Sequence, residues 1–289
     1  MKMRWTISVA ATLCLISASP SFAEDDLTAL SGPYLGQDPP DDIPEPFAPG
    51  IVTSDLWEYG GGFSPDMNEL YFLKENENGE MSFVVFEHVG EQWRKSTISR
   101  RIGQPFISPD GKTMHLGKRF KLRTDDGWSE LERLGGEFEE LRIMRLTASS
   151  LGTYYFDEVG TDGDGRIRYS RMVDGKREKP RLASDEINTG TWLAHPFIAP
   201  DESYILWDGR KEDGFGDSDI YVSFRQSDGS WGSAINLGEK INTQAWEASA
   251  SVTPDGKYLF FNRKMGERNV DVFWVSAQVL EDLKAAQDK

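Results

Sequence analysis

The chain has 289 residues and a formal net charge of -16, from 32 Lys and Arg against 48 Asp and Glu. This acidic balance disfavours nucleic acids and anionic membrane surfaces as partners, because both are bound by clustered Lys and Arg. The single cysteine, Cys14, cannot form an internal disulfide, so the fold must be held by a hydrophobic core, which a chain of this length can bury.

The first 23 residues have the pattern of a secretory signal peptide. Lys2 and Arg4 precede a short apolar run at 7–16, and small residues lead to Ala23, after which acidic residues begin. We therefore predict a signal peptide over 1–23, cleaved after Ala23, and a periplasmic or secreted mature protein with a net charge of -16 - 2 = -18. No stretch reaches the roughly 20 apolar residues of a transmembrane span.

A short phrase then recurs along the chain. A small residue, Pro and Asp precede an apolar and aromatic run; only the third copy lacks both Pro and Asp. Pro presets φ for a turn, Asp can cap it and Gly accepts positive φ, while aromatic and β-branched residues suit the strand that follows. Each copy therefore predicts a β-hairpin. The copies are at 63–72, 107–116, 148–156, 198–207 and 252–261.

Each hairpin is followed by two further predicted strands. The third strand is clearest at 219–224, and the fourth begins at a turn marked by Trp93, Trp128 or Trp231, with Lys176-Arg177 in place of Trp in the third copy. Four short antiparallel strands repeated at intervals of about 40 to 55 residues are typical of a β-propeller. We predict an all-β fold of five four-stranded blades over 57–276.

The fifth copy lacks a fourth strand of its own, because 277–289 reads as a short helix and tail. In the N-terminal segment, 24–56, the sequence near 45–52 is similar to 231–237, which precedes the fifth copy. We therefore predict that residues near 45–52 complete the last blade beside the strand at 270–276. Such closure would remove exposed sheet edges.

The repeats resemble a known family. The Ser-Pro-Asp-Gly-Lys phrase, the Asp-Ile-Tyr-Val-Ser strand at 219–223, the Gly-Ser-Trp turn and the Ile-Asn-Thr segments at 187–189 and 241–243 are similar to WD40-like β-propeller repeats of the TolB type. The resemblance extends over nearly all of the mature chain and is strongest in the fourth and fifth copies. It implies an exported or envelope-associated propeller that binds proteins or glycans. It implies no catalytic residue set.

A binding site is expected at one end of the propeller channel, where the chain enters the first strand of each blade. Aligning the copies on the Pro-Asp turn places at one level Trp57-Glu58, Arg101-Ile102, Leu141-Arg142, Trp192-Leu193 and Trp246-Glu247, and two residues further Gly60, Gln104, Met144, His195 and Ser249. The Trp residues could pack between blades or stack on sugar rings and aromatic side chains. The candidate ligand-binding residues are Trp57, Arg101, Gln104, Trp192 and Trp246.

The candidate catalytic residues are Glu58, Arg142, His195 and Glu247. The two glutamates would act as a glycosidase pair only at a separation of about 5 to 9 Å. His195 is most simply a hydrogen-bonded core histidine. No Gly-x-Ser-x-Gly elbow, phosphate loop or histidine spacing suited to zinc occurs in the sequence.

Two acidic loops, at 157–165 and 212–219, contain the weak metal candidates Asp162, Asp164, Asp217 and Asp219. Neither loop has oxygen ligands at positions 1, 3 and 5 with Gly at 6 and Glu at 12, as a calcium loop requires. Tight connections between blade strands also favour Gly and Asp for their backbone conformation. We predict no metal and no cofactor, with calcium as the alternative.

Two functions follow from this pattern. The first is an exported binding scaffold for an envelope protein, a peptide or a saccharide. The alternative is a propeller-fold glycan hydrolase or lyase that acts in the central funnel. An enzyme needs two of the candidate side chains within reach of one substrate atom, whereas a scaffold tolerates their burial or separation. The oligomeric state is not set by the sequence.

Overall fold

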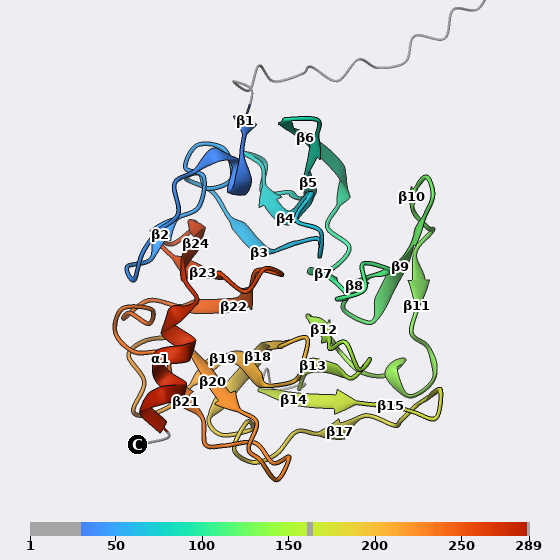
Figure 1. Cartoon of the computed structure of the whole chain (residues 1–289), viewed down its shortest axis with the longest axis vertical. Helices are drawn as coiled ribbons and strands as arrows, with labels where there is room; N and C mark the ends of the chain where they lie inside the picture. Colours follow the sequence, from blue (N-terminus) through green and yellow to red (C-terminus); the bar gives the residue numbers. More distant parts are fainter. Residues whose placement is uncertain (1–29, 161–163, 288–289) are drawn as a thin grey trace, which may run out of the picture.

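The computed structural model describes residues 30–160 and 164–287, and these residues form a five-bladed β-propeller (Figure 1). Five small antiparallel sheets stand around a common centre, with the first strand of each blade on the inside (Figure 1). The prediction of an all-β fold with five blades is confirmed. The predicted signal peptide, 1–23, lies outside the described residues.

The first two blades differ in size. Blade 1 has long strands, with a short strand added to its outer edge, and blade 2 has short inner strands and a divided outer edge. Blade 1 consists of β3 (Glu58–Phe63), β4 (Glu69–Glu75), β5 (Met81–Val89), β6 (Gln92–Arg100) and β1 (Leu30–Ser31). Blade 2 consists of β7 (Pro105–Ile107), β8 (Thr113–Leu116), β9 (Arg119–Thr124), β10 (Gly127–Trp128) and β11 (Glu132–Arg133).

The remaining blades are four-stranded sheets. Blade 3 consists of β12 (Leu146–Ala148), β13 (Tyr154–Val159), β14 (Gly165–Ser170) and β17 (Arg181–Leu182), with a side hairpin of β15 (Met172–Val173) and β16 (Lys176–Arg177). Blade 4 consists of β18 (Thr191–Ile198), β19 (Tyr204–Arg210), β20 (Asp219–Phe224) and β21 (Ile235–Asn236). Blade 5 consists of β22 (Glu247–Val252), β23 (Tyr258–Lys264), β24 (Val270–Ser276) and β2 (Glu45–Pro46).

In blade 3, Lys176-Arg177 lies in the side hairpin, and the fourth strand of the sheet comes later, at β17. Arg177 folds back onto the blade: its Nη1 donates to the carbonyl oxygens of Gly152 at 2.6 Å and Ser170 at 2.8 Å, and its guanidinium lies over the ring of Tyr154 at 3.4 Å. The prediction that the fourth strand of this blade begins at Lys176-Arg177 is therefore wrong, because these two residues pair with Met172-Val173 in the side hairpin.

The N-terminal segment joins the last blade at β2, which pairs antiparallel with β24 through Glu45 opposite Trp274 (Figure 1). Phe47, the first residue after β2, donates its backbone N–H to the carbonyl oxygen of Val272 at 2.8 Å and has a fully buried side chain. The ladder is shorter than the predicted 45–52 stretch, because Ala48 adopts a left-handed φ of 44° and starts a turn. Whether this contact holds the ring together stays a prediction.

The core is built between blades by aromatic and β-branched side chains from alternate strand positions. Phe47 lies at the junction of blades 5 and 1, with ring centroids 4.8 Å from Phe260, 5.2 Å from Trp274 and 6.5 Å from Phe63. The short helix α1 (Gln278–Gln287) follows β24 and buries Leu280, and two 3₁₀ turns are η1 (Pro33–Gly36) and η2 (Gly136–Phe138). Within the described residues, no helix is long and apolar enough to cross a membrane.

Candidate functional site

Five equivalent positions lie in the first strand of each blade or immediately before it. Each lies three residues before the last residue of the first strand. That last residue pairs with the second strand at or next to its start, as Phe63 does with Leu70 and Ala148 does with Tyr154. Three of the five have left-handed φ, at β-bulges or next to them, which redirect side chains. We call this set the inner ring: Gly60, Gln104, Arg145, His195 and Ser249.

Our alignment of the third copy was wrong by one residue. Pairing of Ala148 with Tyr154 puts Arg145, and not Met144, in the inner ring. The Arg145 side chain is buried, whereas Met144 is exposed. The error arose because this copy lacks the Pro and Asp that anchor the alignment in the others. The turn of this copy is also one residue shorter, with six positions from Ala148 to Tyr154 against seven from Phe63 to Leu70, so counting back from the apolar run also leads to Met144.

Three junctions between blades are joined by one repeated hydrogen bond. A second-strand side chain of each blade accepts the backbone N–H of the inner-ring residue in the next blade. These bonds run from His195 to Asp157 at 3.0 Å, from Ser249 to Asp208 at 2.9 Å and from Gly60 to Asn262 at 2.9 Å. We call them the junction bonds. They fix the bulged backbone of blades 4, 5 and 1.

Blades 1 and 2 have no such acceptor, because the equivalent positions hold Leu73 and Gly117. Neither side chain contains a hydrogen-bond acceptor. Gly117 has a left-handed φ of 69°, and a Cβ there would lie 2.7 Å from the carbonyl oxygen of Ile143. The chain therefore passes close to the next blade at this point, with no side chain between them.

A buried polar chain crosses the channel from blade 1 to blade 4. The Nδ1 atom of His195 lies 2.9 Å from Asp208, and its Nε2 atom lies 2.7 Å from the hydroxyl of Tyr59. With Asp208 accepting from Nδ1–H, the Nε2 atom accepts a hydrogen bond from the Tyr59 hydroxyl. Burial, and then the charge of Asp208, raise the pKa of Tyr59. This arrangement matches a hydrogen-bonded core histidine.

Two inner-ring side chains have unused polar atoms. The Oε1 atom of Gln104 and the Oγ atom of Ser249 are buried and make no hydrogen bond of good geometry within the described part of the chain, although both side chains lie close enough to the Tyr59 hydroxyl to lower its pKa. Buried polar atoms are usually paired with protein or ordered water. These two atoms therefore offer positions for water or for a polar ligand atom inside the channel.

The structure does not expose the two candidate glutamates. Glu58 and Glu247 are both 0% exposed, and each caps the turn before its strand in the same way. Glu58 accepts from the Ser54 hydroxyl at 2.5 Å and backbone N–H at 3.1 Å, and lies 3.2 Å from Lys74. Glu247 repeats this with Thr243 and with Arg263 at 2.9 Å. Both are bonded within the protein, so this geometry favours a structural role for the pair.

The candidate aromatic rim is scattered. Trp246 stacks on Tyr59 with ring centroids 5.8 Å apart, and both Trp246 and Trp57 pack against the core between blades 5, 1 and 2. Trp192 is 54% exposed. Arg101 and Arg142 are exposed, and Arg142 donates weakly to the carbonyl of Gly160 at 3.4 Å.

The acidic side chains of these loops are bonded to other groups of the protein. Asp164 accepts from the backbone of Trp192 at 3.0 Å and pairs with Arg166, and Asp217 pairs with Arg210. Asp219 is buried and accepts the N–H of Phe215 at 2.7 Å. Asp162 lies outside the described residues. Within 30–160 and 164–287, no group of three or more His, Cys, Asp or Glu side chains is placed to hold a metal ion.

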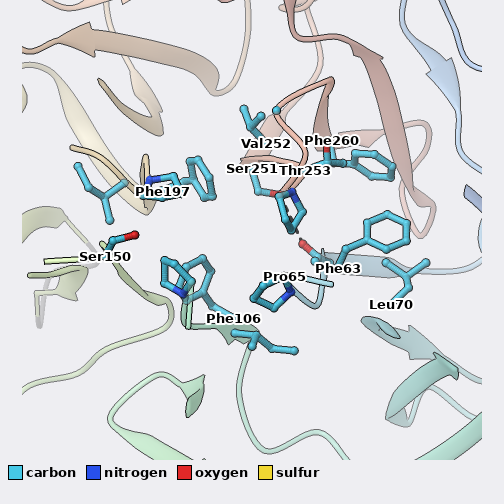
Figure 2. Close-up of a pocket in the computed structure, with 18 of the residues that line it drawn as sticks. Phe63, Pro65, Leu70, Phe106, Ser150, Phe197, Ser251, Val252, Thr253 and Phe260 are labelled. Atoms are coloured by element: carbon cyan, nitrogen blue, oxygen red, sulfur yellow. Dashed lines mark hydrogen bonds between the residues drawn. The ribbon is translucent and has the colours of Figure 1, made fainter. Parts of the chain in front are cut away.

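A cavity of about 360 Å³ lies at the other end of the channel, among the Pro-Asp turns (Figure 2). We call it the Pro-Asp cavity. Its wall is mostly apolar, and none of the five candidate ligand-binding residues lines it. Side chains from different blades surround it, including Phe63, Pro65, Phe106, Phe197, Val252 and Phe260 (Figure 2). The repeated phrase that marks the blades therefore also supplies the wall of this cavity.

The cavity exists because equivalent inner-strand positions carry side chains of very different size. Blades 2 and 4 place Phe106 and Phe197 there, with ring centroids 6.3 Å apart, whereas blades 1 and 5 place Gly62 and Ser251. A Cβ added to Gly62 would meet no atom within 4 Å. The small residues leave open the space that two further phenylalanines would fill.

Comparison with known proteins gives similarity in structure only. No family model and no curated protein matches the sequence. Among solved structures, a TolB-like protein of Agrobacterium tumefaciens is 17% identical, with 77% of this chain and 78% of that chain covered and a TM-score of 0.45. The GH62 α-L-arabinofuranosidase catalytic domain of Coprinopsis cinerea is 9% identical, with 81% and 97% covered and a TM-score of 0.47. A thermostable family-43 glycoside hydrolase is 13% identical, with 81% and 90% covered and a TM-score of 0.44.

Proposed function

We propose that this protein is a binding module that receives an apolar segment of a protein or peptide partner in the Pro-Asp cavity. The observation that carries the proposal is the lining of the cavity, to which blades 1, 2, 4 and 5 contribute Phe, Ile, Val or Leu side chains. Ligand sites are concave, mostly apolar and equipped with few polar groups. A volume of about 360 Å³ lies within the range of such sites.

The cavity lining favours an apolar partner over a saccharide. Among the described residues, the lining includes no Asp, Glu, His, Asn or Gln side chain. The polar side chains of the lining are Arg145, Ser150, Tyr204, Ser251 and Thr253, which are too few to replace the water hydrogen bonds of the many hydroxyls of a saccharide. Each hydrogen bond that is not replaced costs about 1 to 3 kcal/mol. An apolar side chain instead gains about 25 cal/mol for each Å² removed from water.

The hydrolase alternative has less support. A glycosidase needs two carboxyl groups beside the scissile bond, and Glu58 and Glu247 are buried and bonded to their own turns. The Tyr59, His195 and Asp208 side chains do lie within hydrogen-bond reach of one another, but all three are buried. A turnover assay on a panel of oligosaccharides tests this alternative, and hydrolysis that His195→Gln abolishes would establish it.

The binding proposal can be tested by filling the cavity from its rim. Ser150 lines the cavity, is exposed, and points its hydroxyl toward the space between the lining side chains (Figure 2). Ser150→Trp should therefore block the cavity without disturbing the core. The neighbouring Leu151 is 70% exposed and does not line the cavity, so Leu151→Trp is a matched control.

The measurement is a selection of random peptides displayed on phage, followed by fluorescence polarisation with the enriched peptides. We expect enriched peptides to contain apolar or aromatic residues, Ser150→Trp to weaken their binding at least tenfold, and Leu151→Trp to leave it unchanged. Tight peptides that bind both variants equally would show that the Pro-Asp cavity is not the binding site.

Export of the protein is a second part of the proposal and rests on the sequence pattern of residues 1–23. Expression in a bacterial host with separation of the periplasm, followed by N-terminal sequencing, tests it. We expect the mature chain to start at Glu24. A cytoplasmic product that retains Lys2 and Arg4 would contradict the predicted signal peptide.

A further inference from the structure

One cation lines the Pro-Asp cavity without a counter-ion. Arg145 is 2% exposed, and its Nη1 donates to the carbonyl oxygen of Ala250 at 3.0 Å. In the described part of the chain this is the only side-chain hydrogen bond of Arg145, and no ion pair includes it. A guanidinium has five N–H donors, so most of its donor capacity is unused.

Such burial is unfavourable unless an anion compensates it. A buried charge costs several kcal/mol when it lacks a partner with good geometry. Burial lowers the pKa of Arg145 to about 10, with opposing contributions from Tyr59, Asp208 and Asp157, so the side chain is still a cation at neutral pH.

The two buried carboxylates nearby do not neutralise Arg145 by direct contact. Asp157 accepts the backbone N–H groups of Met144, Arg145 and His195, and Asp208 accepts from the His195 ring and the Ser249 backbone. Neither carboxylate lines the cavity. A ligand in the cavity therefore meets the guanidinium of Arg145 and does not meet these two acids.

Resting on the proposed function, we propose that the Pro-Asp cavity binds the C-terminal carboxylate of its partner, with Arg145 as the anion-binding residue and the phenylalanines around the last apolar side chain. An Arg fork matches a carboxylate with two parallel N–H···O bonds. A C-terminal residue with an apolar side chain carries that side chain and a carboxylate together. These two groups match the phenylalanine wall and the Arg145 guanidinium of the cavity. A free aromatic or aliphatic acid carries the same chemistry, so the test separates the two sources.

The experiment compares three probes by isothermal titration calorimetry on the purified full-length mature protein. They are the peptide acetyl-Ala-Ala-Leu-Phe with a free C-terminal carboxylate, the same peptide as a C-terminal amide, and 3-phenylpropionate. We expect the free acid peptide to bind at least tenfold more tightly than the amide. Phenylpropionate should bind more weakly than the acid peptide, because it lacks the preceding residues.

Two variants assign the effect to the cavity. Arg145→Met keeps the length of the side chain and removes its charge, and it should reduce the acid-to-amide ratio to within twofold. Ser150→Trp should weaken all three probes. If Arg145→Met fails to fold by circular dichroism, Arg145→Lys replaces it; a point charge without the planar fork should reduce the ratio at least threefold.

The outcomes separate this inference from the proposed function. Equal affinity of acid and amide peptides, both lost in Ser150→Trp, would overturn the carboxylate site and leave the binding function intact. Phenylpropionate that binds as tightly as the acid peptide would overturn the chain-end assignment in favour of a small acid. No binding of any probe at millimolar concentration would overturn the carboxylate inference, and the peptide selection then decides the proposed function by itself.

Discussion

Blade 2 and the other four blades are built from the same repeated phrase but are joined to their neighbours differently. The junctions from blade 3 to 4, 4 to 5 and 5 to 1 each contain a junction bond, with Asp157, Asp208 or Asn262 as the acceptor. Both junctions of blade 2 lack one, because Leu73 and Gly117 take the acceptor positions. The repeated sequence phrase therefore encodes the hairpin within a blade, whereas one residue of the second strand decides whether a junction bond links that blade to the next.

Blade 2 also has short inner strands: β7 has 3 residues, as has β12 of blade 3, and β8 has 4 residues, fewer than the second strand of any other blade. Its buried His115 has an Nδ1 atom without a hydrogen-bond partner in the described chain, and burial, followed by the charge of Arg177, lowers the pKa of His115 to about 3. This histidine stays neutral at physiological pH. Blade 2 thus combines few backbone hydrogen bonds between its inner strands with the lack of a junction bond on either side, which predicts lower local stability.

The largest expected effect is the loss of the link between blades 5 and 1. Deleting 40–52 removes β2 and the buried Phe47, Ala48 and Val52. Since Phe47→Ala alone should cost about 3 to 5 kcal/mol, we expect the deletion to unfold blade 5 at room temperature. Urea unfolding followed by Trp fluorescence measures both variants. Glu45→Ala, on an exposed residue, is the control, and an unchanged midpoint in the deletion variant would refute closure by this segment.

A smaller effect is expected from removing one junction bond. Asn262→Ala leaves the Gly60 N–H without its acceptor and the Glu58 carbonyl, at 3.0 Å from Nδ2, without its donor. Two unsatisfied buried groups should lower the free energy of unfolding by about 2 to 4 kcal/mol. The exposed Asn68 provides a control, Asn68→Ala, which should stay within about 0.5 kcal/mol of the wild type. A loss below about 1 kcal/mol for Asn262→Ala would mean that junction bonds do not hold the ring.

Hydrogen exchange compares the local stability of blade 2 with that of blades 4 and 5 without any substitution. We expect the backbone amides of β7 and β8 to exchange at least tenfold faster than those of β18 and β22. Tenfold corresponds to a difference of about 1.4 kcal/mol in the free energy of local opening. Mass spectrometry after peptic digestion resolves these segments. Equal protection in blades 2 and 4 would show that the junction bonds do not set local stability.

The smallest expected effect concerns pH at the junction of blades 5 and 1. Burial, and then the charges of Glu58 and Asp55, raise the pKa of Asp271 to about 6, with Lys74 opposing. The unfolded value is about 3.9, so the contribution of this group to stability is complete below pH 4 and is lost as the pH rises through 6. Asp271→Asn should therefore stabilise the protein at pH 7.5 by up to about 1 kcal/mol after allowance for solvent screening.

Thermal unfolding of both proteins at pH 4.5 and 7.5 tests this prediction. The gain from Asp271→Asn should shrink toward zero at the lower pH, where the wild-type carboxyl is already protonated. A gain of the same size at both pH values would point to packing, and not to ionisation of Asp271, as its cause.

The sequence predicted the local structure well, whereas the contacts between blades depend on residues that are far apart in the chain. Hairpins at 63–72 and 252–261 follow from turn residues and apolar runs that are close in the chain, and their repetition indicated five blades. The meeting of Tyr59 with His195 depends on two strands from different blades, and no local pattern encodes it. The one-residue error at Arg145 had a large effect because adjacent residues on a strand point to opposite faces.

The sequence by itself determined the repeating blade, because turn chemistry and strand periodicity act over about ten residues. Only the tertiary structure decided that Glu58 and Glu247 are buried turn caps, and that the cavity lies at the Pro-Asp end of the channel. The cavity depends on the sizes of side chains such as Gly62 and Phe197, which face one another only after five blades have closed into a ring. Packing between distant residues is a property of that ring, and not of any one repeat.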